Sequence, residues 1–525
     1  MYKQSPESRS VVVTVLCALF CLCSEKTPDP ALLTTVDTQP GAVSEPVLRT
    51  TLPASWDENW FASPAVYDLD DDGKKEIIAA RHSVLYVWNA DGTLRWRAPV
   101  GMSASTSSDH GSDRMYCSPV VGDLTGNGFG EIAICYSNRV AVYDRNGSLL
   151  PGWPVSFPTT SNELRSLAAC DLDRDGACEL LAVKTGDGPV TAVWDITGKM
   201  VDGWPQADAD DLNDYGGYNQ NIGCADLDGN GAPDVVCTYD ICHIGVMQGD
   251  GAPWKANTMF EGTYACNVPM FHDLALAVQG WGGDGNDRDE FTDSPPVFAD
   301  MDGDGLPEII LYSDHERAGE YVNRGNSLWA LNPDMTRVDG FTTLVTSGMP
   351  LYTGYENNIV QVAPSPCISL LGTAVPHIIV PSYDGWMYCY SASGMEVWRV
   401  QFDAAGEPFV GAGEAVAGDL DNDGIPEVVF TTYSVSKGVS HLFILNNRGA
   451  LMHRVPIAGR GSMAAPTLAD VDGDGVVEIV ISLKDVLGGG DGGVQIWEVA
   501  SAVKNTIDWP AGRGNYLRTG DFTIR

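Results

Sequence analysis

Seven short acidic stretches along the chain share one spacing of oxygen-bearing side chains. Each begins with Asp, has Asp, Asn or Thr at its third and fifth positions, Gly at the sixth, and Asp or Glu at the ninth, as in DMDGDGLPE from residue 300. Carboxylates at alternate positions of a tight loop suit Ca²⁺, a hard cation that takes roughly six to eight oxygen ligands. The pattern therefore predicts up to seven Ca²⁺ sites.

The candidate metal ligands are the side chains at the first, third, fifth and ninth positions of these loops. They are Asp68, Asp70, Asp72 and Glu76; Asp123, Thr125, Asn127 and Glu131; Asp171, Asp173, Asp175 and Glu179; Asp226, Asp228, Asn230 and Asp234; Asp300, Asp302, Asp304 and Glu308; Asp419, Asp421, Asp423 and Glu427; and Asp470, Asp472, Asp474 and Glu478. A backbone carbonyl at the seventh position can complete the shell, and Gly at the sixth permits the positive φ of a sharp turn.

Two other interpretations of the loops are less favourable. An EF-hand places its last Glu at position twelve between helices, whereas here the acid is ninth and an apolar, β-branched run follows. A solvated acidic turn explains one copy but not seven with the same spacing. The copy at 123 has only Asp123 and Glu131 as carboxylates, so we expect it to bind most weakly. Extracellular calcium modules have affinities of about 10⁻⁴ to 10⁻³ M, which suits a structural ion.

The loops are part of a longer repeat. Their starts are separated by 55, 48, 55, 74, 119 and 51 residues, and the longest interval contains a unit that keeps the flanking pattern but lacks the aspartates, at 365–400. Period-2 apolar runs and Asn/Asp-x-x-Gly turns predict four short strands in each of these eight units. We predict an all-β propeller of eight four-stranded blades, with seven blades as the alternative, because closing a ring leaves few exposed strand edges. A row of independent calcium modules is disfavoured, since each unit is too small to bury its own core.

The loop followed by an apolar strand resembles the FG-GAP (VCBS) repeats of integrin-α N-terminal-like β-propellers, over roughly residues 55–520. The ending DWPAGRGNYLRTG (508–520) is similar to the close of bacterial secreted members. The resemblance implies Ca²⁺ between the first and second strands of a blade, at the positions named above and not at 370–378. Integrin propellers have seven blades, whereas eight units are counted here. The stretch 51–60, TLPASWDENW, is expected to supply the fourth strand of the last unit and so close the ring.

The N-terminus predicts export. Lys3 and Arg9 precede a 13-residue apolar run at 11–23, which suits a signal peptide better than a membrane span. The predicted organisation is a signal peptide at 1–23, a Pro/Thr/Ser-rich linker at 24–50, and a propeller at 51–525 with an insertion at about 254–296. An uncleaved anchor and a lipid anchor are the alternatives. The expected location is secreted or at the cell surface.

The net charge of the chain limits the classes of partner that it can bind. The formal charge of −39 argues against nucleic acid, which needs basic patches, and 26 of the 70 acidic residues lie in the seven loops. Ten cysteines follow the signal, and disulfides between neighbouring strands are plausible in an oxidising compartment, with free buried thiols as the alternative. The sequential pairs are Cys117/Cys135, Cys170/Cys178, Cys224/Cys237, Cys242/Cys266 and Cys367/Cys389.

Three stretches break the repeat and are the candidate ligand surface: 207–221, 254–296 and 313–327. They combine aromatic residues (Tyr215, Tyr218, Trp281, Tyr321) with polar ones, a mixture that suits sugars. We therefore expect a recognition or adhesion module for an extracellular glycan or protein ligand. The alternative is a propeller-based polysaccharide lyase or glycoside hydrolase that uses a base such as His272 or His315. No catalytic residue is assigned, because the sequence has no H-E-x-x-H, G-x-S-x-G or P-loop motif.

Overall fold

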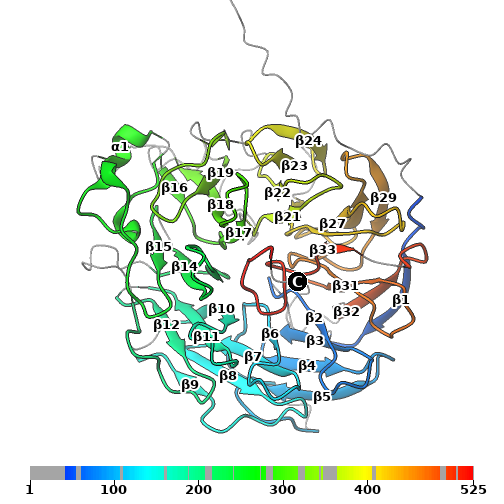
Figure 1. Cartoon of the computed structure of the whole chain (residues 1–525). Coiled ribbons are helices and arrows are strands. Elements are labelled where there is room, and N and C mark those ends of the chain that lie inside the picture. The colour runs from blue at the N-terminus through cyan, green and yellow to red at the C-terminus, as the bar shows by residue number, and fades with distance from the viewer. Residues whose placement is uncertain are drawn as a thin grey trace, which may run out of the picture.

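Eight small antiparallel sheets surround a common axis in the computed structural model, so the protein is an eight-bladed β-propeller (Figure 1). The structure describes residues 42–54, 59, 61–106, 110–158, 162–186, 188–206, 216–239, 242–271, 273–278, 288–316, 325–341, 345–346, 364–404, 410–484, 492–503 and 506–523. Within these ranges, no helix is long and apolar enough to cross a membrane.

Each blade is a meander of consecutive strands that runs outward from the axis. Blades 1 to 4 contain β2 (Ala65–Tyr67), β3 (Glu76–Arg81), β4 (Val84–Trp88) and β5 (Leu94–Pro99); β6 (Val120–Gly122), β7 (Glu131–Tyr136), β8 (Arg139–Tyr143) and β9 (Val155–Ser156); β10 (Leu164–Cys170), β11 (Glu179–Lys184) and β12 (Thr191–Trp194); and β13 (Ile222–Ala225), β14 (Asp234–Thr238) and β15 (Ile244–Met247).

The second half of the ring follows the same plan with additions. Blades 5 to 8 contain β16 (Arg288–Glu290), β17 (Val297–Ala299), β18 (Glu308–Glu316), β19 (Asn326–Leu331) and β20 (Val345–Thr346); β21 (Cys367–Ser369), β22 (His377–Pro381), β23 (Trp386–Ser391) and β24 (Glu396–Gln401); β25 (Gly411–Ala412), β26 (Val416–Gly418), β27 (Glu427–Tyr433), β28 (His441–Leu445), β29 (Leu451–Pro456) and β33 (Ile507–Trp509); and β30 (Thr467–Ala469), β31 (Glu478–Ser482), β32 (Val494–Glu498) and β1 (Val47–Leu52). The 254–296 insertion holds η2 (Thr258–Phe260), η3 (Ala265–Asn267) and α1 (Leu274–Val278).

The unit without aspartates, 365–400, forms a complete four-stranded sheet, which confirms eight blades rather than seven. The strand number per blade is less regular than predicted. Blades 3 and 4 have three strands, and their outermost segments make only isolated bridges, such as Thr191 with Gln206 and Met247 with Pro253. Pro205 and Pro253 lie in these segments, and proline has no N–H to donate to a sheet ladder.

The blades are held together by apolar faces and by a repeated tryptophan contact. The second strands are buried on both faces, as in β3 and β7, because a sheet lies on either side of each blade. The indole N–H groups of Trp96, Trp153, Trp204 and Trp398 each donate to a backbone carbonyl of the next blade, at 2.8–3.1 Å. The recurring tryptophans at 153 and 204 therefore have the packing role that their place in the repeat predicted.

The N-terminal strand closes the ring, although not at the predicted residues. Strand β1 pairs with β32 as the outermost strand of blade 8. Its residues are Val47–Leu52, so it begins within the stretch expected to be linker and ends near the start of the predicted 51–60 segment. The signal at 1–23 and most of the linker lie outside the described residues.

The C-terminal residues 506–523, which we call the axial segment, occupy the centre of the ring (Figure 1). Their carbonyls accept hydrogen bonds from the first strands of five blades, at 2.8–2.9 Å: from Val121, Ala169, Cys224, Phe298 and Leu468 in blades 2, 3, 4, 5 and 8. Strand β33 pairs with β26 of blade 7. Asp508 and Arg518 reach blades 6 and 1, as described below. One short segment thus contacts all eight blades.

The thiols of Cys117, Cys135, Cys170, Cys178, Cys224, Cys237, Cys367 and Cys389, which form four of the five sequential pairs, are free. The sulfur atoms of Cys117 and Cys135 lie 3.0 Å apart. The disulfides that the sequence made plausible for these four pairs are therefore not formed.

Candidate metal centre

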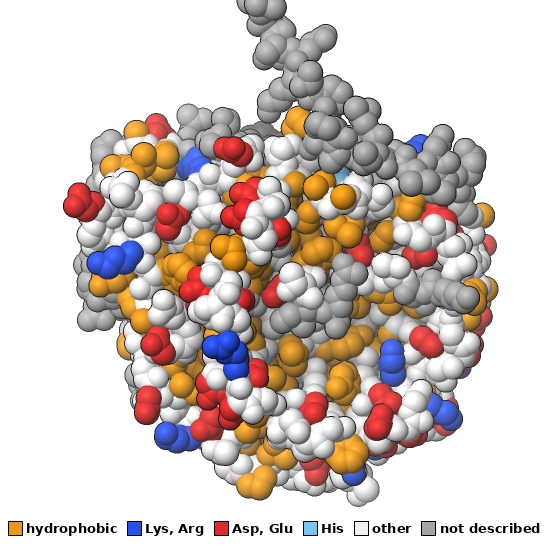
Figure 2. Space-filling view, in the orientation of Figure 1, with side chains coloured by type: hydrophobic (Ala, Val, Ile, Leu, Met, Phe, Trp, Pro, Cys, Tyr) orange, Lys and Arg blue, Asp and Glu red, His pale blue; other side chains and the backbone are white. Residues whose placement is uncertain are grey.

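The seven acidic loops lie at one edge of the ring, by which we mean one of the two flat faces of the disc. They share this face because each connects the first strand of its blade to the second. The loop at 68–75, for example, joins β2 to β3, and Tyr67 pairs with Glu76 at its base. On the face shown in Figure 2, acidic side chains are spread over several blades around the centre and basic side chains are few. The structure therefore brings the repeated carboxylates to equivalent places around the axis.

All seven loops have one backbone conformation. In each, the first Asp accepts a hydrogen bond from the N–H of the sixth-position glycine, at 2.8–3.1 Å. The fifth side chain accepts one from the seventh residue, at 2.7–2.9 Å. The glycines have φ between 85° and 94°, as at Gly73 and Gly176, a region that residues with a side chain rarely adopt.

The ninth residue of each loop is a buried acid. One of its carboxylate oxygens accepts the N–H of the second loop residue, at 2.6–3.1 Å in all seven loops. Burial raises the pKa of Glu179, Asp234, Glu308 and Glu478 to about 7, and that of Glu427 to about 9. The neighbouring loop aspartates add to this rise by like-charge repulsion. A bound cation would oppose both effects, because it stabilises the charged carboxylate.

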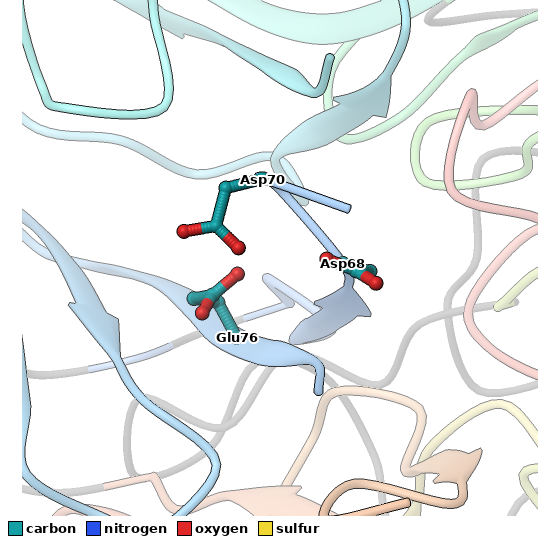
Figure 3. A group of neighbouring side chains, drawn as sticks. All are labelled: Asp68, Asp70 and Glu76. Carbon is teal, nitrogen blue, oxygen red and sulfur yellow. The ribbon is translucent and has the colours of Figure 1, made fainter. Parts of the chain in front are cut away.

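The geometry of the loops fits a hard cation. The first, third and ninth carboxylates of the loops at 68, 171, 226 and 419 have oxygens within 4.8 Å of one another, and so do the first, third and fifth of the loop at 300. Figure 3 shows Asp68, Asp70 and Glu76 pointing toward a common space. Buried carboxylate oxygens of Asp70, Asp226 and Asp421 have no hydrogen-bond partner. Such orphan oxygens are costly unless a ligand engages them.

The loop at 123 is arranged differently from the other six. Asn127 Nδ2 donates to Glu131 Oε1 at 2.9 Å, and Thr125 Oγ1 donates to the same oxygen at 3.3 Å. The side chains of this loop therefore form hydrogen bonds with one another, whereas carboxylates at the third and fifth positions of the other loops repel the ninth carboxylate. That this copy binds a cation most weakly stays a prediction.

Blade 6 replaces the missing acid with a residue from elsewhere in the chain. Where the other blades have Glu or Asp at the start of the second strand, this blade has the buried His377. The second-position amide, Leu370 N–H, donates to Asp508 Oδ2 of the axial segment at 2.8 Å, and Ser369 Oγ donates to the same oxygen at 2.9 Å. The missing loop is thus compensated by a carboxylate 138 residues away.

The opposite edge of the ring holds several long connections between blades. Strand β5 ends at Pro99 beside Val84, and β20 ends at Thr346 beside Ser327, so both end at the edge away from the acidic loops. The strands that flank 100–119, 207–221 and 347–366 therefore end and begin at this edge. Near the axis, a small cavity of about 20 Å³ is lined by Asn219, Gln220, Asp293 and Glu414, among others.

The predicted ligand surface lies partly outside the described residues. The stretches 207–221, 254–296 and 313–327 belong to blades 3, 4 and 5 or connect them. Of the four aromatic residues named for this surface, Tyr218 is described: the Arg165 guanidinium lies over its ring, 5.4 Å from the centroid. Tyr215, Trp281, Tyr321 and His272 are outside the described residues, and so is the side chain of His315.

Comparison with known protein families agrees with the repeat. The model of the FG-GAP-like repeat matches three places, residues 68–134, 123–182 and 419–481, and each includes at least one acidic loop. The chain is therefore an eight-bladed β-propeller that carries FG-GAP-like repeats.

Comparison with curated proteins finds no significant match. Among solved structures, the chain is similar to BamB from Moraxella catarrhalis, with 13% identity, a TM-score of 0.46, and coverage of 86% of this chain and 98% of that chain. Sqt1 from Saccharomyces cerevisiae has 10% identity, a TM-score of 0.49, and coverage of 88% and 99%. The rhamnogalacturonan lyase YesW has 14% identity, a TM-score of 0.48, and coverage of 87% and 75%. At these identities none of them assigns a function.

Proposed function

We propose that the protein is an exported, calcium-stabilised β-propeller that recognises an extracellular glycan or protein ligand. The observation that carries this proposal is the difference between the two edges of the ring. Seven short loops of one conformation lie at one edge, and in three of them a buried carboxylate oxygen has no hydrogen-bond partner. At the other edge, the strands begin and end that are joined by segments whose length differs from blade to blade. A rigid scaffold with variable loops on one face is a common arrangement for binding.

Calcium has a structural role in this proposal. Four side-chain positions and the seventh carbonyl of a loop supply oxygens, and the ion cancels the repulsion between carboxylates that are two to eight residues apart. Seven ions would change the formal charge from −39 to about −25. Because the loops join the first two strands of their blades, their order stabilises the ring as a whole. Removal of calcium should therefore lower the melting temperature, and an unchanged value in excess chelator would refute the structural role.

The ligand-binding part of the proposal has a separate test. The mature protein, loaded with Ca²⁺, is immobilised and incubated with acidic and neutral polysaccharides, and mass spectrometry identifies which are retained and which are shortened. Retention of intact glycan supports recognition. Shortened products with an unsaturated end would instead identify a polysaccharide lyase, and saturated ones a hydrolase. The absence of both directs the search to protein ligands, through cross-linking at the face with the long connections.

The axial segment favours ligand binding on a face of the disc and not in a tunnel along the axis. Its residues fill the centre of the ring and hydrogen-bond to the first strands. Arg513 and Arg518 are fully buried there, and their guanidinium groups donate to backbone carbonyls. A ligand would therefore bind at a face of the disc and not through its axis.

A further inference from the structure

In two of the acidic loops, an arginine side chain of the protein itself lies among the carboxylates. In blade 1, Arg95 Nη2 lies 2.6 Å from Asp70 Oδ2, and Arg95 Nη1 lies 2.7 Å from Glu76 Oε1. These acids occupy the third and ninth positions of the loop. One guanidinium group therefore bridges two of the proposed metal ligands, a geometry that suits the planar fork of arginine.

Blade 8 repeats this arrangement with an arginine from the other end of the chain. Arg49 Nη2 lies 2.6 Å from Asp472 Oδ2, and Arg49 Nη1 lies 3.5 Å from Glu478 Oε1. These acids again occupy positions three and nine. Arg49 is more exposed than Arg95, 37% against 20% of the side chain, so its pair is weaker.

The two arginines occupy the same place in the blade. Each is the extra residue of a β-bulge in the outermost strand: in β5 the pairing shifts between Leu94 and Trp96, and in β1 between Leu48 and Thr50. A bulge turns one side chain away from the regular alternation. Here that side chain reaches the acidic loop. Because the same contact occurs at equivalent positions of two blades, it is a regular feature of these blades and not a chance contact.

Blades 6 and 7 have the same bulge with an apolar residue. In β29 the pairing shifts between Leu451 and His453, which leaves Met452 as the extra residue, and Val397 has this place in β24. Blade 7 has a full acidic loop, and its bulge residue is Met452 and not an arginine. Among the residues that the structure describes, no Lys or Arg forms an ion pair with the carboxylates of the five other loops.

We propose that Arg95 and Arg49 are tethered cations that keep the loops of blades 1 and 8 ordered when calcium is absent. These blades adjoin each other where the N-terminal strand closes the ring, and Lys75 N–H donates to Val471 O across their boundary at 3.2 Å. The closure of the ring is thus independent of metal, whereas the loops of blades 3, 4, 5 and 7 depend on it. Only the metal dependence of blades 3, 4, 5 and 7 rests on the proposed calcium role.

Hydrogen–deuterium exchange with mass spectrometry tests the proposal on the purified mature protein, with Ca²⁺ and with excess chelator. In the wild type, chelation should speed exchange at least about tenfold in peptides covering 419–427 and 300–308, and less than about threefold in those covering 68–76 and 470–478. R95Q should transfer the metal dependence to 68–76, and R49Q to 470–478. M452R should do the reverse and reduce the chelator response of 419–427. Arg399→Gln, a change of an exposed arginine in β24 of the loop-less blade, is the matched control and should change none of these responses.

Two results would overturn the proposal: an equal chelator response of 68–76 and 419–427 in the wild type, or a response of 68–76 that R95Q leaves unchanged. If R95Q does not fold, the gain of protection expected for M452R remains an independent test. If Ca²⁺ protects no loop in the wild type, the proposed calcium role fails instead. In that case the role of Arg95 is tested in metal-free protein: faster exchange of 68–76 in R95Q than in the wild type supports it, and equal exchange refutes it.

Discussion

Replacement of Arg518 by alanine should destabilise the whole ring, because its side chain is a hydrogen-bonding centre of the axial segment. Arg518 is fully buried, and its guanidinium donates to four carbonyls. Nε donates to Pro119 of blade 2 at 3.1 Å, Nη1 to Gly512 at 2.7 Å, and Nη2 to Ser63 and Pro64 of blade 1 at 3.2 and 3.3 Å. The R518A change leaves all four acceptors without this donor.

The expected magnitude follows from these four acceptors. A buried polar group that loses its partner costs about 1–3 kcal/mol. Water that enters the space left by the side chain restores some of these bonds, so we take about 1 kcal/mol per carbonyl and about 4 kcal/mol in total. Unfolding entropy is about 2.1 cal/mol/K per residue, or about 1.1 kcal/mol/K for 525 residues. The melting temperature should therefore fall by about 4 °C.

The assay is thermal unfolding by scanning calorimetry at one Ca²⁺ concentration and pH. Arg518→Lys retains the charge but loses the fork, so its melting temperature should lie between those of R518A and the wild type. Arg399→Ala is the surface control: its ion pair with Glu396 is 3.6 Å long and half exposed, and its effect should be within about 0.5 kcal/mol. An R518A protein that melts within 1 °C of the wild type would refute the reasoning that the axial segment holds the blades together.

Three further predictions concern single contacts. D508A removes the acceptor of the Leu370 N–H and should cost about 1–3 kcal/mol in denaturant unfolding, whereas D508N keeps an acceptor oxygen; equal losses would contradict the role of Asp508 in blade 6. Burial raises the pKa of Glu414 to about 8, so the folded state holds this proton more tightly than the unfolded chain, and stability falls as the pH rises from about 4.3 toward 8. E414Q should reduce this fall in a series of melting curves, and curves parallel to the wild type would show that Glu414 does not cause it. W398F loses the 2.9 Å hydrogen bond to the Asn447 carbonyl and should lower unfolding free energy by about 1 kcal/mol, with no change expected if the indole is only a packing group.

The repeat, the loops and the number of blades were predictable because their causes are local. Asp at alternate positions, Gly at the sixth and an acid at the ninth lie within nine residues, and the hydrogen bonds that shape the loop join residues two to seven apart. The unit at 365–400 was recognised from its apolar runs alone, since a blade needs its strands and not its aspartates. The regularity failed where prolines interrupt the outer strands of blades 3 and 4, and the sequence signal for this was already present at Pro205 and Pro253.

The sequence by itself determined the class of fold, the edge loops and their chemistry, because each depends on short segments that repeat. The tertiary structure alone decided which residues far apart in the chain complete those segments. Arg518 meets Ser63 across 455 residues, Asp508 serves a loop of blade 6, and Arg49 reaches an acid more than 400 residues away. No spacing rule predicts such contacts, because ring closure places the two ends of the chain beside each other only after every blade has formed.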